Sequence, residues 1–142
     1  MFDLANYLPY LINRAGVRVA TKFTQDMKGH DVTIQDWRVL AALAFYGPQR
    51  MSMLADHTSI DRTTLSRLIS RMEDAGFVQR SRAEDDGREV HISLSEKGRQ
   101  TADNIIPLAV HYEQVALDGF SAEEASQFKD MLKRAYANLE RL

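Results

Sequence analysis

Residues 59–76 read SIDRTTLSRLISRMEDAG, and this stretch decides the fold that we expect. Asp61 can cap a helix over 62–75, because its carboxylate can accept hydrogen bonds from backbone amides that the first turn leaves free. At about 100° per residue, one arc of this helix is apolar and carries Leu65, Leu68, Ile69 and Met72. The opposite arc carries Thr63, Arg67 and Ser70, flanked by Thr64, Ser66 and Arg71. The pattern predicts one buried stripe and one surface of hydroxyls and guanidiniums.

The placement of charge on this helix favours contact with DNA. Glu73 and Asp74 come only in the last turn, so the first three turns present no carboxylate. Hydroxyls and arginines are the groups that contact base edges and phosphates, whereas a carboxylate facing a polyanion is repelled. A solvated helix face without a partner would have the same polarity, so the neighbouring segments must distinguish the two interpretations.

The segments on either side predict a winged helix. Ser52 can cap a short helix over 53–58, and a tight turn then leads to Asp61, which together make a helix-turn-helix. After Gly76, the segments FVQRSR and REVHISLS predict two strands joined by an acidic tip that contains glycine. A helix-turn-helix followed directly by a hairpin is the winged-helix order, and it favours the DNA interpretation.

The tip of the hairpin provides a second candidate contact. Arg88 lies just past the tip, where an extended arginine can enter a minor groove. Asp86 can hold that guanidinium in place through a charge-assisted pair. A polar β-turn without a DNA role is the simpler alternative, since turns favour Asp and Gly.

The rest of the chain predicts a mainly α fold with a small β component. Apolar residues at three- and four-residue steps indicate a long helix over 3–27. Thr33 and Asp36 form a capping-box pattern that opens a helix which Gly47 ends. The last two helices are expected over 96–117, where Pro107 should introduce a kink, and after a second capping box, Ser121 with Glu124.

Composition excludes several classes of function. The chain of 142 residues contains no cysteine, which excludes disulfides and thiolate chemistry and suits the cytoplasm, where we expect the protein to be located. It has no apolar run of about 20 residues and no signal-peptide pattern, so no membrane role is expected. The net charge of −2 argues weakly against a nucleic-acid partner, unless the cations gather on one surface.

The sequence gives little support to an enzyme. It has no glycine-rich phosphate loop and no His-Glu-x-x-His motif, so we expect no catalytic residues and no cofactor. The four histidines are widely spaced, and they are His30, His57, His91 and His111. We therefore expect no metal site; zinc held by His30, His111 and nearby acids is the remaining alternative, which an elemental assay would test.

These segments resemble the MarR family of bacterial winged helix-turn-helix transcription regulators over nearly the whole chain. DWRVLAALAFYGP is similar to the second helix of that family, and MSMLADHTSIDRTTLSRLISRMEDAGFVQR to its helix-turn-helix and first wing strand. DGREVHISLSEKG is similar to its wing signature, with matches at Asp86, Arg88, Ile92 and Leu94. Ser95 stands where threonine is more usual and keeps the capping hydroxyl.

The resemblance implies one MarR-type domain over 1–142. Residues 33–95 would be the DNA-binding part, while 1–29 and 96–142 would be dimerisation helices. It also implies a homodimer, a pseudo-palindromic double-stranded DNA operator and, usually, repression that a small molecule relieves. A two-fold dimer should place its recognition helices about 34–36 Å apart. Helix 62–75 would then lie in the major groove, and the wing, 84–89, in the minor groove.

The resemblance assigns DNA contacts to individual residues. The recognition-helix contacts would be Thr63, Thr64, Ser66, Arg67 and Arg71, with Arg67 expected to reach a base. The wing contact would be Arg88, supported by Asp86. Ser52, at the start of the preceding helix, can offer its hydroxyl and amide to a phosphate.

The family's effectors often bind in a crevice near the first, second and fifth helices. The aromatic and cationic residues available there are Tyr7, Tyr10, Arg14, Arg18, Trp37, Arg38, Tyr46 and His111. Arginine beside aromatic rings suits an aromatic carboxylate or its thioester. Core packing for Trp37 and ion pairs for Arg14 or Arg18 are the alternatives.

A protein-interaction module with the same winged-helix fold, but without operator binding, is the competing function. In that module the polar face of helix 62–75 would meet an acidic protein partner. The two functions differ in their dependence on salt, because neutralised phosphates release counterions.

Overall fold

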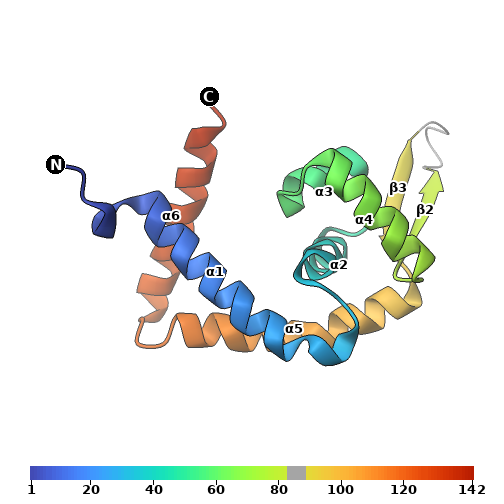
Figure 1. Ribbon diagram of the computed structural model, residues 1–142, viewed down its shortest axis with the longest axis horizontal. Helices are drawn as coiled ribbons and strands as arrows, with labels where there is room; N and C mark the ends of the chain where they lie inside the picture. Colours follow the sequence, from blue (N-terminus) through green and yellow to red (C-terminus); the bar gives the residue numbers. More distant parts are fainter. Residues whose placement is uncertain (83–88) are drawn as a thin grey trace. The chain divides into compact units, whose positions relative to one another are not determined.

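The computed structural model describes residues 1–82 and 89–142 (Figure 1). The chain forms two compact units, 1–109 and 110–142. The described residues are mostly helical with one small antiparallel sheet, as the sequence predicts. No helix within them has the length and apolar content needed to span a membrane.

The first unit contains most of the elements. Its helices before the hairpin are two short 3-10 helices, Leu4–Asn6 and Lys28–His30, and the α-helices α1 (Leu8–Asp26), α2 (Ile34–Tyr46), α3 (Met51–Thr58) and α4 (Arg62–Asp74). Its strands are β1 (Gln49–Arg50), β2 (Val78–Arg82) and β3 (Val90–Leu94). Helix α5 (Glu96–Ala116) begins in this unit, and α6 (Ala122–Leu139) belongs to the second.

Helix α4 is held by the hydrophobic core of the first unit. Its apolar stripe, Leu65, Leu68, Ile69 and Met72, is buried, which confirms the predicted arc. The stripe belongs to a cluster with Leu40 and Leu43 of α2, Leu54 of α3 and Ile92 of β3. In Figure 1, α4 lies between α3 and the β2–β3 hairpin. The core therefore fixes which face of α4 remains exposed.

The sheet has the strand order β1-β3-β2. The predicted hairpin is present, with Val78 opposite Leu94 and Arg82 opposite Val90. Strand β1 was not predicted, and it pairs Gln49 with Ile92. A strand of two residues has no alternation for a sequence pattern to reveal, and it forms only because β3 is there to pair with it.

Two predicted helix starts are wrong. Helix α3 begins at Met51 and not after Ser52, because β1 runs directly into it and Arg50 becomes the N-cap residue without a side-chain bond. The helix expected over 3–27 is interrupted, since Leu4–Asn6 is a 3-10 helix and α1 begins only at Leu8. Pro9 lies in the first turn of α1, where its missing N–H costs nothing.

Gly98 explains how α5 starts beside the hairpin. A Cβ at this position would overlap the backbone carbonyl oxygen of Phe77. Ser95 supports the same start, because its hydroxyl donates to the Gly76 carbonyl and accepts from the Gly98 amide. The helix can therefore approach the strand closely only with glycine at residue 98.

Asp36 joins the start of α2 to the last turns of α4. It completes the predicted capping box, with Thr33 N donating to Asp36 Oδ2 at 2.9 Å and Asp36 N to Thr33 Oγ1 at 3.1 Å. Its second oxygen, Oδ1, accepts a hydrogen bond of 2.7 Å from Arg71 Nη2. The Asp36 side chain is 2% exposed, so the carboxylate of this ion pair is shielded from solvent.

Replacing Asp36 with alanine is expected to lower the free energy of unfolding by about 2 kcal/mol, because a helix cap and a charge-assisted hydrogen bond are lost together. Urea unfolding followed by circular dichroism measures the change. Asp56→Ala, at an exposed aspartate of α3, is the matched control and should change stability by less than about 0.5 kcal/mol. Equal losses in the two variants would contradict the assigned role of Asp36.

Candidate nucleic-acid interface

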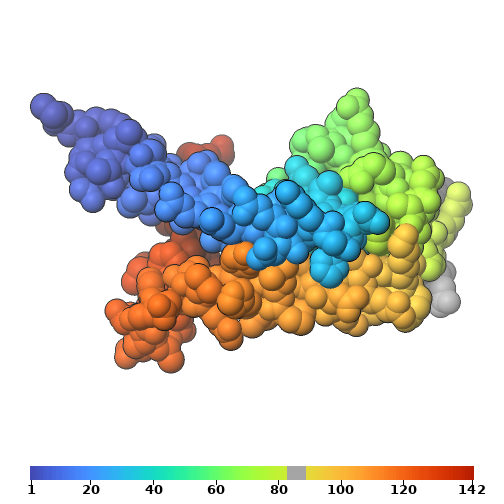
Figure 2. All heavy atoms as spheres, turned by 60° about the horizontal axis from the view of Figure 1, so that its bottom comes forward, coloured from blue at the N-terminus to red at the C-terminus, as the bar shows by residue number. Residues whose placement is uncertain are grey.

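The exposed face of α4 carries the predicted polar residues. Thr63, Ser66 and Arg67 are all exposed and lie opposite the buried stripe. Within residues 1–82 and 89–142, the Arg67 guanidinium makes no hydrogen bond and no ion pair. Figure 2 shows α4 and β2, in green and yellow-green, at the surface of the first unit. Arg67 is thus free to contact a ligand from solution.

Asp61 caps α4 as predicted, and it also binds the hydroxyl of Thr64, which is one of the predicted DNA contacts. Its carboxylate accepts from Thr64 N at 2.9 Å and from Thr64 Oγ1 at 2.7 Å. These bonds, the one from the Thr64 hydroxyl first, lower the pKa of Asp61 below its usual value. The Thr64 hydroxyl proton is therefore committed to the cap, and Thr63 is the freer donor of the two threonines.

The end of α4 is bonded to β2 by Arg80, which is not among the predicted contacts. Arg80 Nη2 donates to Ser70 Oγ at 3.0 Å, and Arg80 Nη1 lies 3.4 Å from Glu73 Oε1. The Arg80 amide also donates to Glu73 Oε2 at 3.2 Å. The late position of Glu73 therefore has a structural reason, which is to attach the first wing strand to α4. Ser70 and Glu73, ten and seven residues before Arg80, gave no local signal of this contact.

Arg71 is divided between the core and the solvent. Its Nη2 is bonded to Asp36, yet 57% of the side chain remains exposed. Its other guanidinium N–H groups can donate hydrogen bonds to a partner from solution. Arg71 differs in this respect from Arg67, which has no internal partner among the described residues.

Glu89 connects the base of the wing to the start of α3. Its Oε1 lies 3.0 Å from Arg50 Nη1, and its Oε2 lies 3.5 Å from His91 Nε2. The hydrogen bond from Arg50 is the main cause that holds the pKa of Glu89 below its usual value. Ser52 is exposed in the first turn of α3. The predicted contacts Asp86 and Arg88 lie outside the described residues.

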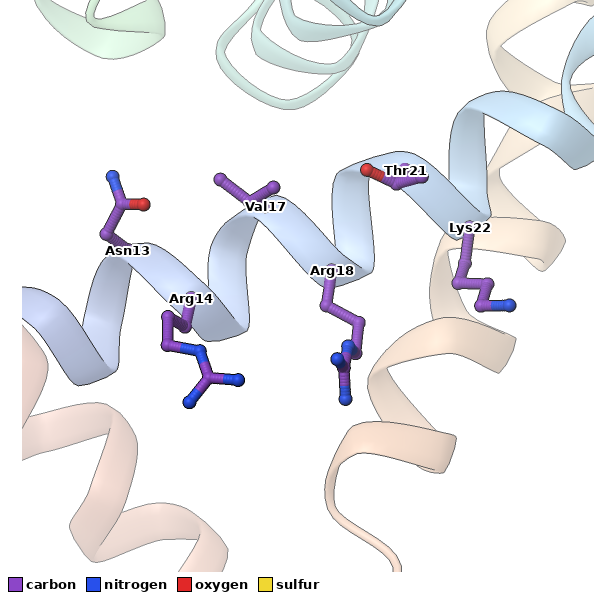
Figure 3. A pocket seen from close by; sticks show the side chains of 6 residues that line it. All are labelled: Asn13, Arg14, Val17, Arg18, Thr21 and Lys22. Atoms are coloured by element: carbon purple, nitrogen blue, oxygen red, sulfur yellow. The ribbon is translucent and has the colours of Figure 1, made fainter. Parts of the chain in front are cut away.

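The seven predicted ligand residues of the first unit divide between two hollows and ring contacts outside them. Arg14 and Arg18 line a hollow of about 330 Å³ on α1, together with Asn13, Val17, Thr21 and Lys22 (Figure 3). In Figure 3 the three cations of this hollow point to the same side of α1. Tyr10 lies under the Arg14 guanidinium, 5.4 Å from it, and Tyr7 packs against Phe2. His111 belongs to the second unit, where its ring is 5.6 Å from that of Tyr112.

The other three predicted ligand residues share a second hollow. It has a volume of about 560 Å³ and is lined by Trp37, Arg38, Ala41, Ala42, Phe45, Tyr46, His57, Thr58 and Ser59. We call it the α2–α3 hollow, after the two helices that supply most of these residues. Trp37 also packs against Phe23 of α1, with ring centroids 5.7 Å apart, so its predicted core role and its ligand-facing position coexist.

The sequence is similar to those of known transcriptional regulators. A sequence model described as MarR family matches residues 30–89, from the last residue of the 3-10 helix Lys28–His30 to the residue before β3. The HTH-type transcriptional regulator SarZ of Staphylococcus haemolyticus is 28% identical over 137 residues, covering 95% of this chain and 90% of that protein. Over residues 30–89 the chain is similar to the MarR family. Its curated relatives are helix-turn-helix transcriptional regulators, so the predicted resemblance is confirmed.

Solved structures of MarR-family proteins confirm the winged-helix fold. A MarR-family regulator from Silicibacter pomeroyi has a TM-score of 0.86 at 24% identity, covering 96% of this chain and 92% of that one. BpsR of Bordetella bronchiseptica has a TM-score of 0.83 at 23% identity, covering 96% of this chain and 97% of its own. The BpsR structure concerns the regulation of its DNA binding by 6-hydroxynicotinic acid.

One further exposed cation of α4 was not among the predicted contacts. Arg62 is the first residue of α4 and, like Arg67, has no partner within the described residues. The sequence signal was available, because the first turn of a recognition helix approaches the duplex. No cluster of three or more His, Cys, Asp or Glu side chains suited to a metal occurs in the described part of the chain.

Proposed function

We propose that the protein is a sequence-specific transcription regulator that binds a pseudo-palindromic DNA operator, with α4 in the major groove. The observation that carries this proposal is the exposed face of α4, where Thr63, Ser66 and the unpaired Arg67 lie opposite the buried stripe. Arg67 would donate to a base edge, because a guanidinium without an internal partner can form a bidentate pair with guanine.

The other predicted contacts have supporting roles in this proposal. Arg71, whose Nη2 is bonded to Asp36, would contact the DNA backbone with its remaining N–H groups. Thr64 would contact the backbone only if its hydroxyl left Asp61 and donated to a phosphate. Ser52 would offer its hydroxyl to a phosphate from the first turn of α3. Arg88, supported by Asp86, would enter the minor groove.

We also propose that the operator is bound by a homodimer. In α6 no residue is buried, and four of its large apolar side chains, Phe128, Met131, Tyr136 and Leu139, are 46–65% exposed. Leu8, Leu11 and Ile12 of α1 are 43–54% exposed. Apolar faces of this extent mark interaction surfaces. The terminal helices, 1–29 and 96–142, would then hold two copies together, and 33–95 would bind DNA.

An effector is the third part of the proposal. The protein would act as a repressor that an aromatic acid, or its thioester, releases from DNA. The DNA binding of BpsR is regulated by 6-hydroxynicotinic acid, which is an aromatic acid. This similarity supports the proposed class of effector. The protein would need no further cofactor.

Selection of duplexes from a random pool tests operator binding directly. We expect enrichment of a two-fold symmetric sequence. Fluorescence anisotropy at increasing salt should then give a slope of log K against log[salt] near −5 or steeper, as expected when six or more phosphates are neutralised. A protein-interaction module would enrich no sequence, and that result would overturn the proposal.

A further inference from the structure

We infer that Asp36 is a positioning residue for DNA binding, because it holds the Arg71 guanidinium in place at the edge of the exposed face of α4. This inference rests on the proposed function, and it adds to the interface a residue of α2 that is itself buried. Helices α2 and α4 lie in the same unit and contribute to the same core cluster (Figure 1). The bond between Asp36 and Arg71 therefore joins two helices that already pack together.

The carboxylate of Asp36 is a rigid anchor. Its Oδ2 accepts from Thr33 N at 2.9 Å within the capping box, and its Oδ1 accepts from Arg71 Nη2 at 2.7 Å. With both oxygens bonded and the side chain 2% exposed, the carboxylate has little freedom to turn. A bond of this length between charged groups is at the short, strong end for such pairs. The start of α2 thus sets the position of Arg71 Nη2.

The rest of the Arg71 side chain is open to solvent. It is 57% exposed, and Arg71 follows Arg67 by four residues, so the two side chains are neighbours on one side of α4. A guanidinium is planar, so fixing one nitrogen restricts the directions of the other N–H groups. A phosphate would meet donors that are already oriented. Ordering such a side chain only on binding would weaken DNA affinity about 2- to 12-fold.

The charge of Asp36 gives the opposite expectation from its bond. A carboxylate close to DNA is repelled by the phosphates, so its removal should by charge alone tighten binding to any duplex. Positioning predicts weaker binding, although the protein then carries one negative charge fewer. The sign of the change therefore separates the two roles. Arg62 is the internal comparison, since it is exposed on α4 but has no anchor among the described residues.

The test is a double-mutant cycle with Asp36→Asn and Arg71→Gln in the full-length protein. An asparagine oxygen can still accept from Thr33 N, whereas its NH₂ group cannot accept from Arg71. Fluorescence anisotropy measures binding to the selected operator and to a duplex of random sequence. We expect Asp36→Asn to weaken both about 2- to 12-fold, because a phosphate contact is independent of sequence. The double variant should bind no more weakly than Arg71→Gln alone.

Three further variants serve as controls, and circular dichroism verifies that each remains helical. The losses from Asp36→Asn and Arg62→Gln should multiply in the combined variant, because Arg62 does not contact Asp36. Asp74→Asn removes an exposed carboxylate from α4 and should tighten binding slightly. Asp36→Glu keeps the carboxylate and should recover part of the affinity. Tighter binding by Asp36→Asn, or losses from Asp36→Asn and Arg71→Gln that multiply, would overturn the inference.

Arg71→Lys provides a test that leaves Asp36 and its helix cap unchanged. Lysine keeps the charge but has no planar fork, so it cannot hold one donor on Asp36 and present the others in fixed directions. We expect a loss close to that of Arg71→Gln, and wild-type affinity would overturn the inference. The random duplex requires no operator. Absence of an enriched sequence would therefore contradict the proposed function while the cycle still gives its own result, and a wild type that bound no duplex would overturn both.

Discussion

A protein with aspartate in place of both Met131 and Leu139 is expected to be a monomer whose operator affinity is lower by at least about a hundredfold. The two side chains are 58% and 65% exposed and lie eight residues apart on one face of α6. In a two-fold dimer each substitution occurs twice and replaces burial worth about 1.5–3 kcal/mol per side chain with a buried charge. Losing the second half-site then removes the gain from bivalent binding, about 10²- to 10⁴-fold.

Light scattering after size exclusion measures the mass of this variant, and fluorescence anisotropy measures its DNA affinity. The matched control carries Ser126→Asp and Ala137→Asp, which lie on the opposite, polar face of α6 and should leave the dimer intact. Circular dichroism verifies that both proteins remain helical. A dimer that survives the Met131 and Leu139 substitutions would show that α6 does not form the interface.

Arg67→Ala should cost about 1–3 kcal/mol of binding to the selected operator, which corresponds to about a 5- to 150-fold loss. The loss should be concentrated at one base pair of each half-site, because the guanidinium has no partner among the described residues and is free to form a bidentate contact. Competition with duplexes altered at single positions measures this dependence.

Two comparisons make the Arg67 result decisive. On random DNA the Arg67→Ala variant should lose only about the contribution of one charge. Arg99→Ala removes the same charge from α5 and should affect operator and random DNA alike, and only slightly. If Arg67→Ala weakened binding equally on all sequences, Arg67 would be a phosphate contact and not a base contact.

Features that depend on nearby residues were predictable from the sequence. The buried stripe of α4 and the capping boxes at Thr33 and Ser121 each involve residues within about two turns of one helix. Periodicity and cap chemistry report such short-range features directly.

Contacts between distant residues were not predictable in this way. Asp36 and Arg71, which bond to each other, are 35 residues apart in the sequence, and the bonded pair Arg50 and Glu89 is 39 residues apart. Neither pair therefore leaves a pattern in the local sequence. The start of α3 was misplaced for the same reason, since β1 exists only through pairing with β3. Periodicity predicts the exposed face of each helix but not which other helix packs beside it. For this reason the predicted cationic ligand residues of α1 and the predicted ligand residues of α2 line two different hollows.

The bonds of Arg80 to Ser70 and Glu73 have a consequence for the arrangement of an operator. Because they attach the end of α4 to the first wing strand, a helix in the major groove and a wing in the neighbouring minor groove would keep a nearly constant helical phase. Base substitutions would then weaken a site gradually, whereas inserting a single base pair between the two contacts would put one of them out of reach.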